Sequence, residues 1–353
     1  MHRGFERVSV TIKDVARMAN VSVASVSRAL NGHGGVTAET QQRIREVAAR
    51  LRYVPHSAAR SLITRRTHTI GALLPDLHGA FFSELIRGID LAARARGLHL
   101  LVSSSHGDAE EAATALRAMQ GRVDGLLVMS PHADEAFIEQ NMPTPTPAVL
   151  INTHVPGHRH AVVDIDDRGG ARAMVQHLLD HGRRRIVFIA GPEANNDVRE
   201  RENGYREALE ANGLGANQLI INGDFSEESG FRAAQAILGM NPRPDAIFAA
   251  NDMMAIGCLS ALAEAGVNVP GDIAVGGFDD IPMARYVSPP LSTVRVRIAE
   301  LGETAMERLA QMIESGEDMV VPPRHVAGTE LVVRASCGGS APSRRRHAPP
   351  TDA

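Results

Sequence analysis

Cysteine is scarce in this chain, and long apolar runs are missing. The two cysteines, Cys258 and Cys337, stand in no metal-binding spacing, which favours a reducing cytoplasm over a disulfide framework. No stretch approaches the ~20 apolar residues of a membrane-spanning helix. The first seven residues lack the apolar run of a secretory signal. These absences predict a cytoplasmic protein with no membrane partner.

The short motifs of common enzyme classes are also missing. The sequence has no G-x-S-x-G nucleophile elbow, no P-loop and no H-E-x-x-H zinc motif. No G-x-G-x-x-G follows the first predicted strand, which argues against a nicotinamide dehydrogenase. The histidines are scattered without metal-ligand spacing. We therefore expect a protein that is not an enzyme and that holds neither a cofactor nor a metal.

Lysine is nearly absent, because Lys13 is the one lysine among 37 basic residues. We attribute this to codon bias and not to phosphate recognition. The distribution of charge is more informative. Residues 1–66 hold 12 basic and 4 acidic residues, a net charge of +8, whereas the remainder holds 25 and 37, a net charge of −12. A basic head on an acidic body is typical of a protein that binds nucleic acid with its head.

The segment Thr11–Asn31 predicts two short helices joined by a tight turn, the arrangement that places one helix in the DNA major groove. Thr11 caps the first helix, and Asp14 completes a start that is similar to a capping box. Asn20 suits the turn because asparagine tolerates unusual backbone angles, and Ser22 caps the second helix. The alternative is an ordinary cluster of small amphipathic helices.

The second predicted helix turns small and basic side chains outward. Val26 and Ala29 face inward with Val21 and Leu30, near a third helix that starts at Thr37. The residues left available to DNA are Val23, Ala24, Ser25, Ser27 and Arg28. Valine and alanine offer only apolar contact, for example to a thymine methyl, whereas arginine can pair with guanine.

From Thr69 onward strands and helices alternate, which predicts an α/β fold with parallel sheets flanked by helices behind a small all-α headpiece. Predicted strands are 69–74, 99–103, 125–129, 149–152, 162–165, 185–190, 218–222, 246–250 and 273–276. Predicted helices are 81–96, 109–119, 169–181, 199–212, 227–238, 253–265 and 298–314. Two similar lobes that the chain crosses several times suit a hinge-bending ligand clamp.

The expected domains are a headpiece at 1–55, a hinge helix and linker at 56–66, a ligand-binding and dimerisation body at 67–336, and a disordered tail at 337–353. Within the body we expect an N-subdomain of about 67–166 and 293–324, and a C-subdomain of about 167–292 and 325–336. The segment Ser288–Leu291 marks the second crossing between them. The tail lacks a leucine heptad, so we expect a homodimer and not a tetramer.

Polar and aromatic residues follow the predicted strands, where parallel sheets bind ligands. The candidates are Asp76, Phe82, Asn152, Arg201, Phe225, Asn251 and Asp279. Carboxylate, amide and guanidinium groups can bracket hydroxyls while aromatic faces cover C–H bonds. This mixture suits a polyhydroxylated ligand.

Each candidate has a structural alternative. Asn251 and Asp252 can cap the helix that follows them, and we favour that role for Asp252. Asp279 can be a turn residue, and Arg201 can be a solvated charge on its helix. Phe81 is expected in the core.

The segment Thr11–Asn31 resembles the headpiece of the lactose/galactose repressor (LacI/GalR) family of bacterial transcription regulators. The resemblance continues through Leu51–Pro55 and the hinge His56–Ile63, and then to about Val333. It implies a two-lobed body similar to periplasmic binding proteins, and paired hinge helices that form only on DNA, where Leu62 wedges into the minor groove. The alternative for Leu62 is a simple linker residue. The candidate DNA contacts are Thr11, Ser22, Val23, Ala24, Ser25, Ser27, Arg28, Asn31, Tyr53, Ala59, Arg60 and Leu62.

In the ligand site, the same resemblance assigns Arg201, Asn251 and Asp279 to the principal effector-binding positions. Asn152 stands where the family often has aspartate, so one hydroxyl acceptor has changed its character. Phe82 and Phe225 match positions that are often aromatic.

The predicted function is a transcription regulator of the nucleoid, a repressor that a small carbohydrate releases from a near-palindromic operator. Two alternatives stay open. A purine or nucleoside could act as a co-repressor, because Phe82 and Phe225 could stack on a base. A solute-binding protein without a DNA role is the other alternative, but it predicts a secretion signal and no headpiece, and the sequence contradicts both.

Overall fold

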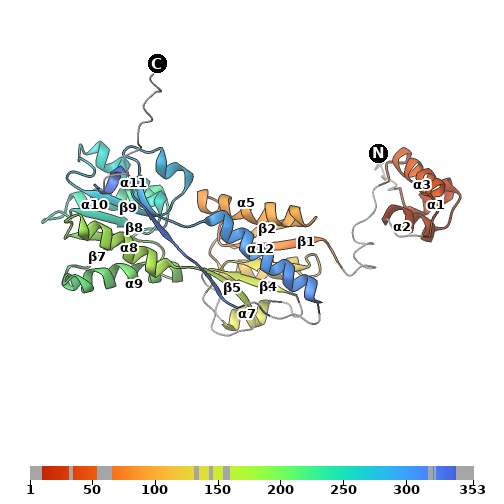
Figure 1. Ribbon diagram of the computed structural model, residues 1–353, viewed down its shortest axis with the longest axis horizontal. Coiled ribbons are helices and arrows are strands. Elements are labelled where there is room, and N and C mark those ends of the chain that lie inside the picture. The colour runs from red at the N-terminus through yellow and green to blue at the C-terminus, as the bar shows by residue number, and fades with distance from the viewer. Residues whose placement is uncertain are drawn as a thin grey trace, which may run out of the picture. The chain divides into compact units, whose positions relative to one another are not determined.

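The computed structural model describes residues 10–31, 35–53, 66–130, 135–142, 146–153, 160–316, 321 and 323–338. The chain divides into two compact units, Met1–Thr67 and His68–Ala353 (Figure 1). The predicted DNA contacts Ala59, Arg60 and Leu62 lie outside the described residues, as do residues 339–353 of the predicted tail.

Three short helices make up the described part of the first unit: α1 (Ile12–Ala19), α2 (Val23–Asn31) and α3 (Ala38–Arg50). Their apolar faces share one core, in which Val26 and Ile44 are fully buried. Because each helix has a single apolar face, the opposite face of α2 is left toward solvent.

The predicted helix boundaries in this unit are confirmed by the cap geometry. The carboxylate of Asp14 accepts hydrogen bonds from the backbone N–H of Thr11 at 3.0 Å and from its hydroxyl at 2.7 Å. Asn20 adopts the left-handed conformation, with φ of 50°. The Ser22 hydroxyl accepts from the Ser25 N–H at 3.1 Å and so begins α2.

The first lobe of the body is a six-stranded parallel sheet in the order β11-β5-β4-β3-β1-β2. Its strands are β1 (Thr69–Leu74), β2 (His99–Ser104), β3 (Gly125–Val128), β4 (Ala148–Ile151), β5 (Ala161–Ile165) and β11 (His325–Ala327). Its helices are α5 (Ala80–Ala95), α6 (Ala109–Met119), α7 (Glu135–Asn141) and α12 (Ile298–Ser315). Helix α5 packs closely on α12, because a Cβ at Gly88 would lie 2.0 Å from the carbonyl oxygen of Ala299.

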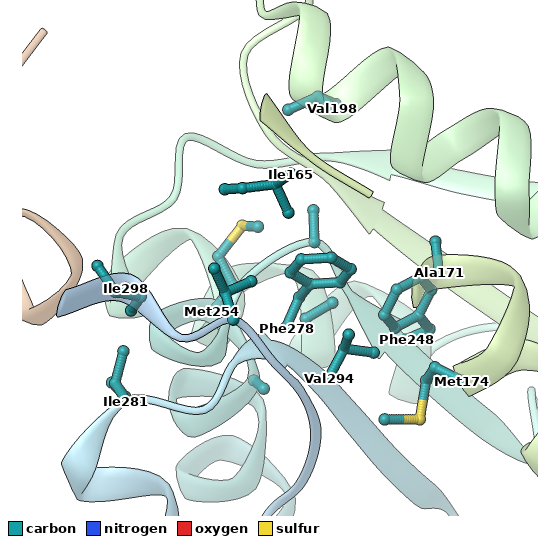
Figure 2. Close-up of a cluster of buried hydrophobic side chains, with 14 of the residues drawn as sticks. Ile165, Ala171, Met174, Val198, Phe248, Met254, Phe278, Ile281, Val294 and Ile298 are labelled. Carbon is teal, nitrogen blue, oxygen red and sulfur yellow. The ribbon is translucent and has the colours of Figure 1, made fainter. Parts of the chain in front are cut away.

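The second lobe is a sheet in the order β12-β10-β9-β8-β6-β7, with only β12 antiparallel to its neighbour. Its strands are β6 (Ile186–Ala190), β7 (Leu219–Asn222), β8 (Ala246–Ala249), β9 (Ala274–Asp279), β10 (Ser292–Arg295) and β12 (Glu330–Val332). Its helices are α8 (Asp167–Asp180), α9 (Asn196–Ala211), α10 (Glu227–Leu238) and α11 (Asp252–Glu264). Phe248 and Phe278 of adjacent strands pack with Val294 and Met174 in its core (Figure 2).

The chain passes between the two sheets after β5, after β10 and after β11. The predicted second crossing at Ser288–Leu291 is wrong, because the next four residues form β10 and pair with β9 of the second lobe. The chain leaves that lobe only at residues 296–297. Residues 325–327 likewise belong to the first sheet, beside β5. Both short strands were missed because their three or four residues include polar ones and carry too little hydrophobic pattern.

The structure also corrects the start of the predicted tail. Ala335–Cys337 form a short 3-10 helix in which Ser336 and Cys337 are buried. The Ser336 hydroxyl donates to the Val275 carbonyl at 2.6 Å, and the Ser292 hydroxyl donates to Cys337 Sγ at 2.9 Å. The Ser336 hydroxyl pairs with backbone hydrogen-bonding groups of the second sheet. The Gly, Pro and Ser content of this segment did not indicate such a structural role. In the part of the chain that the structure describes, no helix is long and apolar enough to cross a membrane.

Candidate functional site

The outer face of α2 presents the predicted DNA contacts to solvent. Ser22, Val23, Ala24 and Arg28 are exposed, Val23 to 41% of its surface, whereas Ser25 and Ser27 are half-buried. This is the face that a major-groove helix would turn toward bases. Small side chains at its start allow close approach, and Arg28 supplies the long hydrogen-bond donor.

Two other predicted contacts have structural roles in the same unit. Thr11 is exposed, but its hydroxyl and N–H are used by the Asp14 carboxylate. Tyr53 packs against the core of the three helices, and burial raises the pKa of its hydroxyl. Asn31 ends α2, and its side chain is not among those that the structure describes.

A pocket of about 100 Å³ lies inside the body, where the two sheets turn the ends of their strands toward each other. A wider space of about 490 Å³ shares much of its wall. The inner pocket is lined by Pro75, Phe81, Phe82, Met129, Asn152, Asn195, Asp197, Arg201, Phe225, Asn251 and Asp279. Six of the seven predicted ligand residues therefore meet in one cavity.

Asp76 is the predicted ligand residue that lies apart from the inner pocket. It is exposed on the wall of the outer space, and its Oδ1 accepts hydrogen bonds from the N–H groups of Leu77 and His78 at 2.6 and 3.0 Å. These bonds give Asp76 the role of a turn residue in the loop after β1.

Arg201 forms the polar base of the inner pocket. Its Nε donates to Asp167 at 2.7 Å, and one terminal nitrogen donates to the carbonyl of Ala250 at 2.6 Å. The guanidinium also lies 3.8 Å above the ring of Phe278, a cation–π contact. With only 4% of its surface exposed, Arg201 is not the solvated helix charge of the alternative interpretation.

Asp279 ends β9 beside this guanidinium, with Oδ1 3.7 Å from a terminal nitrogen of Arg201. That oxygen is buried and has no hydrogen-bond partner in the structure. Burial raises the pKa of Asp279 to about 7, although Arg201 opposes the rise. A buried acceptor without a donor is costly, so a ligand hydroxyl at this point would be favourable.

Asn251 both lines the pocket and caps α11. Its Oδ1 accepts from the Met254 N–H at 3.0 Å, and its amide donates to the Phe225 carbonyl at 3.0 Å. The expected cap role of Asp252 is wrong. Its carboxylate instead accepts from the Ile281 N–H and the Thr293 hydroxyl, so it holds the loop after β9.

Asn152 connects the two lobes at the back of the pocket. It follows β4 in the left-handed conformation, with φ of 45°, which asparagine tolerates. Its Oδ1 accepts from the Ile165 N–H at 3.0 Å, and its amide donates to Asp167 at 3.3 Å. Asn152 therefore helps to hold both the end of β5 at Ile165 and Asp167, the ion-pair partner of Arg201.

Aromatic rings form the apolar wall of the cavity. Phe81 and Phe82 meet edge to face, with ring centroids 5.4 Å apart, and both line the pocket. Phe81, which was expected in the core, is half-buried: it packs against the core of the body and also faces the pocket. Phe225 contributes a third ring, which packs against Gly191 so closely that a Cβ there would lie 2.6 Å from it.

Sequence reasoning missed Asn195 and Asp197, both of which line the inner pocket. Asn195 caps α9 by accepting from the Asp197 N–H at 2.8 Å. Burial and then the charge of Asp167 raise the pKa of Asp197 well above its usual range. The rule of searching after strands would have found them, because both follow β6. Among the described residues, no group of histidine, cysteine and acidic side chains could hold a metal.

A helix-turn-helix head on a body with a polar cleft between two lobes defines a DNA-binding regulator that responds to a small ligand. The model for "Bacterial regulatory proteins, lacI family" matches residues 11–56, and the model for a "Periplasmic binding protein-like domain" matches residues 175–337. The chain belongs to the LacI family, and it is a DNA-binding transcriptional regulator.

Relatives support this over most of the chain. The HTH-type transcriptional regulator GalS of Salmonella typhimurium is 36% identical over 304 residues, which cover 86% of this chain and 89% of GalS. The ribose operon repressor of Escherichia coli is 38% identical over 308 residues, which cover 86% and 93%. The solved structure of the lac repressor dimer bound to operator and the anti-inducer ONPF has a TM-score of 0.83 at 29% identity, with 93% and 99% covered.

Proposed function

We propose that this regulator is a repressor that leaves its operator when a small, uncharged sugar enters the inner pocket. Two copies bind the halves of a near-palindromic operator, each with α2 in a major groove and with Val23, Ala24 and Arg28 against base edges. Sugar binding and operator binding then weaken each other by the same factor, because coupling between two binding sites is reciprocal.

The main observation in favour of a sugar ligand is the buried carboxylate of Asp279. Its buried Oδ1 has no hydrogen-bond partner in the structure and faces a pocket that Asn251 and Arg201 also line. A ligand hydroxyl can donate to this oxygen and accept from a neighbouring amide, as one hydroxyl group does both. The rings of Phe82 and Phe225 can cover the C–H faces that remain.

The charges around the pocket favour an uncharged ligand. The carboxyls of Asp167, Asp197 and Asp279 all act on the single guanidinium of Arg201. That guanidinium is already bonded to Asp167 and to a backbone carbonyl. A phosphate or carboxylate would add negative charge where it cannot be neutralised, so a sugar phosphate or nucleotide should bind poorly. A free purine or nucleoside is the second candidate, because the phenyl rings also suit a flat base.

The test is fluorescence anisotropy at fixed salt with a labelled duplex selected from a palindromic pool. The probes are D-ribose, D-galactose, cellobiose, glucose 6-phosphate, adenosine and hypoxanthine. Release by a neutral sugar but not by glucose 6-phosphate supports the proposal. Tighter operator binding with adenosine or hypoxanthine would instead identify a co-repressor. Weak, salt-sensitive binding to every duplex would contradict the operator assignment itself.

An Asp279→Ala variant assigns the response to the pocket. It should bind the operator as tightly as the wild type and lose its response to the active sugar, because the acceptor for the hydroxyl is gone. Asp180→Ala, which removes an exposed aspartate from α8, is the matched control and should respond normally. A normal response from Asp279→Ala would remove that residue from the ligand site.

A further inference from the structure

The loop after β9 carries two consecutive aspartates with positive φ. Asp279 has φ of 110° and Asp280 has φ of 56°. Residues other than glycine seldom adopt these angles, and they keep them only where the surroundings impose them. The contacts that impose this conformation therefore decide where the Asp279 carboxylate points.

Asp280 is held by two arginines that are far apart in the sequence. Arg295 Nε donates to its Oδ2 at 2.7 Å, and a terminal nitrogen of Arg334 donates to its Oδ1 at 2.5 Å. Only 4% of the Asp280 side chain is exposed. Each carboxylate oxygen thus has its own guanidinium, a pairing that fixes both position and rotation of the group.

The residues on either side of Asp280 are anchored as well. The Ile281 N–H donates to the buried Asp252 carboxylate at 2.9 Å, which also accepts from the Thr293 hydroxyl. The carbonyl of Asp279 accepts from the Val296 N–H at 3.2 Å. The strained loop is therefore fastened to α11 and to the end of β10, while the Asp279 carboxylate itself remains in the pocket wall.

One of the two arginines, Arg295, lies next to a place where the chain passes between the two sheets. Arg295 is the last residue of β10, just before the crossing at residues 296–297. It also donates to Glu330 at 3.3 Å, the first residue of β12 after the third crossing. Arg334 follows β12 and donates to the Leu291 carbonyl at 2.7 Å, ahead of β10. The ion pairs of Asp280 thus join the loop after β9 to two of the three interlobe connections.

We infer that Asp280 is a positioning residue for the ligand-binding carboxylate of Asp279, and that it ties sugar binding to the interlobe connections. The inference rests on the proposed sugar response. Asp280 does not touch the ligand; it acts through the backbone conformation of its neighbour and through Arg295 and Arg334.

The first experiment is a double-mutant cycle on the full chain, read by calorimetric titration with the sugar found active above. Asp280→Asn is the variant, since asparagine also tolerates positive φ and the change removes only the charge. We expect sugar affinity to fall about tenfold or more, within the 5–150-fold range of typical site coupling. Operator affinity without sugar should be unchanged. In an Asp279→Asn background the same change should have no further effect, because the two residues act as one unit.

Ser336→Ala is the matched control for a purely structural role. It removes two buried hydrogen bonds that anchor the same returning segment to β9 and to the start of β10, and neither bond involves Asp280. It should lower the melting temperature and leave sugar affinity within about twofold, as expected for a site that is not coupled to the ligand. Sugar affinity of Asp280→Asn equal to the wild type, or an additive loss in the double variant, would overturn the inference.

Hydrogen exchange without ligand tests the inference even if no sugar in the panel acts. Asp280→Asn should speed exchange at Ile281 and Val296 by about tenfold relative to the rest of the second lobe, because local opening of the loop becomes easier. Unchanged exchange at both amides would also overturn the positioning role. If none of the tested sugars released the wild type from the operator, the proposed function would be contradicted. The hydrogen-exchange result would still test the positioning role of Asp280.

Discussion

The outer face of α2 and the inner pocket hold their functional side chains in opposite ways. On α2, Val23 and Arg28 project into solvent from a helix whose core lies on the other side. In the pocket, Arg201 and Asp279 are 4% and 5% exposed and are surrounded by other charges. Because Val23 and Arg28 are exposed and lie outside the core of the three helices, we expect DNA specificity to change without loss of stability, whereas ligand specificity and the stability of the second lobe are linked.

The largest expected effect is the loss of Arg201. Arg201→Met leaves the carboxylates of Asp167 and Asp279 buried without their cation, which should cost about 3–5 kcal/mol of the free energy of unfolding. Denaturant unfolding of the body, followed by circular dichroism, measures the loss. Arg199→Met on the same helix is the control, because Arg199 is exposed and should change stability by less than ~0.5 kcal/mol. Equal losses in the two variants would mean that the buried charges do not support the fold.

Arg28→Ala tests the other side of the comparison. It should weaken operator binding by about 1–3 kcal/mol and relax base choice at one position of each half-site, because a bidentate contact to guanine is lost. Anisotropy against single-base operator variants measures both effects. Arg17→Ala removes an exposed charge of the same kind from α1 and should not alter base preference. The stability of the three helices should be unchanged, and an unaltered base preference in Arg28→Ala would contradict its role as a reader.

The sequence predicted those parts of the fold that carry local signals. The helices at 109–119 and 227–238 were predicted to the residue, because Asp108 and Ser226 cap them with short polar side chains. Strands β10, β11 and β12 were not predicted, since their three or four residues include polar ones, whereas β3, β4 and β8 are equally short but wholly apolar apart from a glycine. Pairing of distant short strands is a tertiary effect that period and propensity do not encode.

The candidate site divides in the same way. Six of the predicted ligand residues line one pocket, because the ends of parallel strands meet at one edge of a sheet. Nothing in the sequence indicated that Asp167 pairs with Arg201, 34 positions away, or that Asp280 is clamped by Arg295 and Arg334. Such contacts depend on the chain crossing between lobes at the observed places, two of which lay a few residues from their predicted positions.

The smallest expected effect is the pH dependence of sugar binding in the pocket, which the exposed Arg28 of α2 does not share. The pKa of Asp279 is raised from 3.8 to about 7, chiefly by burial. The folded body therefore binds more protons than the unfolded chain between pH 4 and 7, and this residue's contribution to stability falls as pH rises through that window. A sugar hydroxyl donates to the ionised carboxylate, so sugar affinity should rise instead, by about tenfold from pH 6 to pH 8, as the ionised fraction increases around that pKa.

Asp279→Asn removes the titrating carboxyl, so it shows how much of the pH dependence comes from Asp279 and how much from other groups. The variant should bind sugar weakly at every pH, with a nearly flat profile over the same range. Its stability should fall less than that of the wild type as pH rises from 4 to 7, because the contribution of Asp279 is gone while buried Asp197 and Asp252 keep their raised pKa values. Calorimetric titration at pH 6, 7 and 8 measures the affinity. Operator binding without sugar, which depends on exposed arginines that stay charged throughout, should show no such step in either protein. A wild-type sugar affinity that is flat or that falls toward pH 8 would show that the ligand does not donate to Asp279, and that the pocket is held ready by other acceptors.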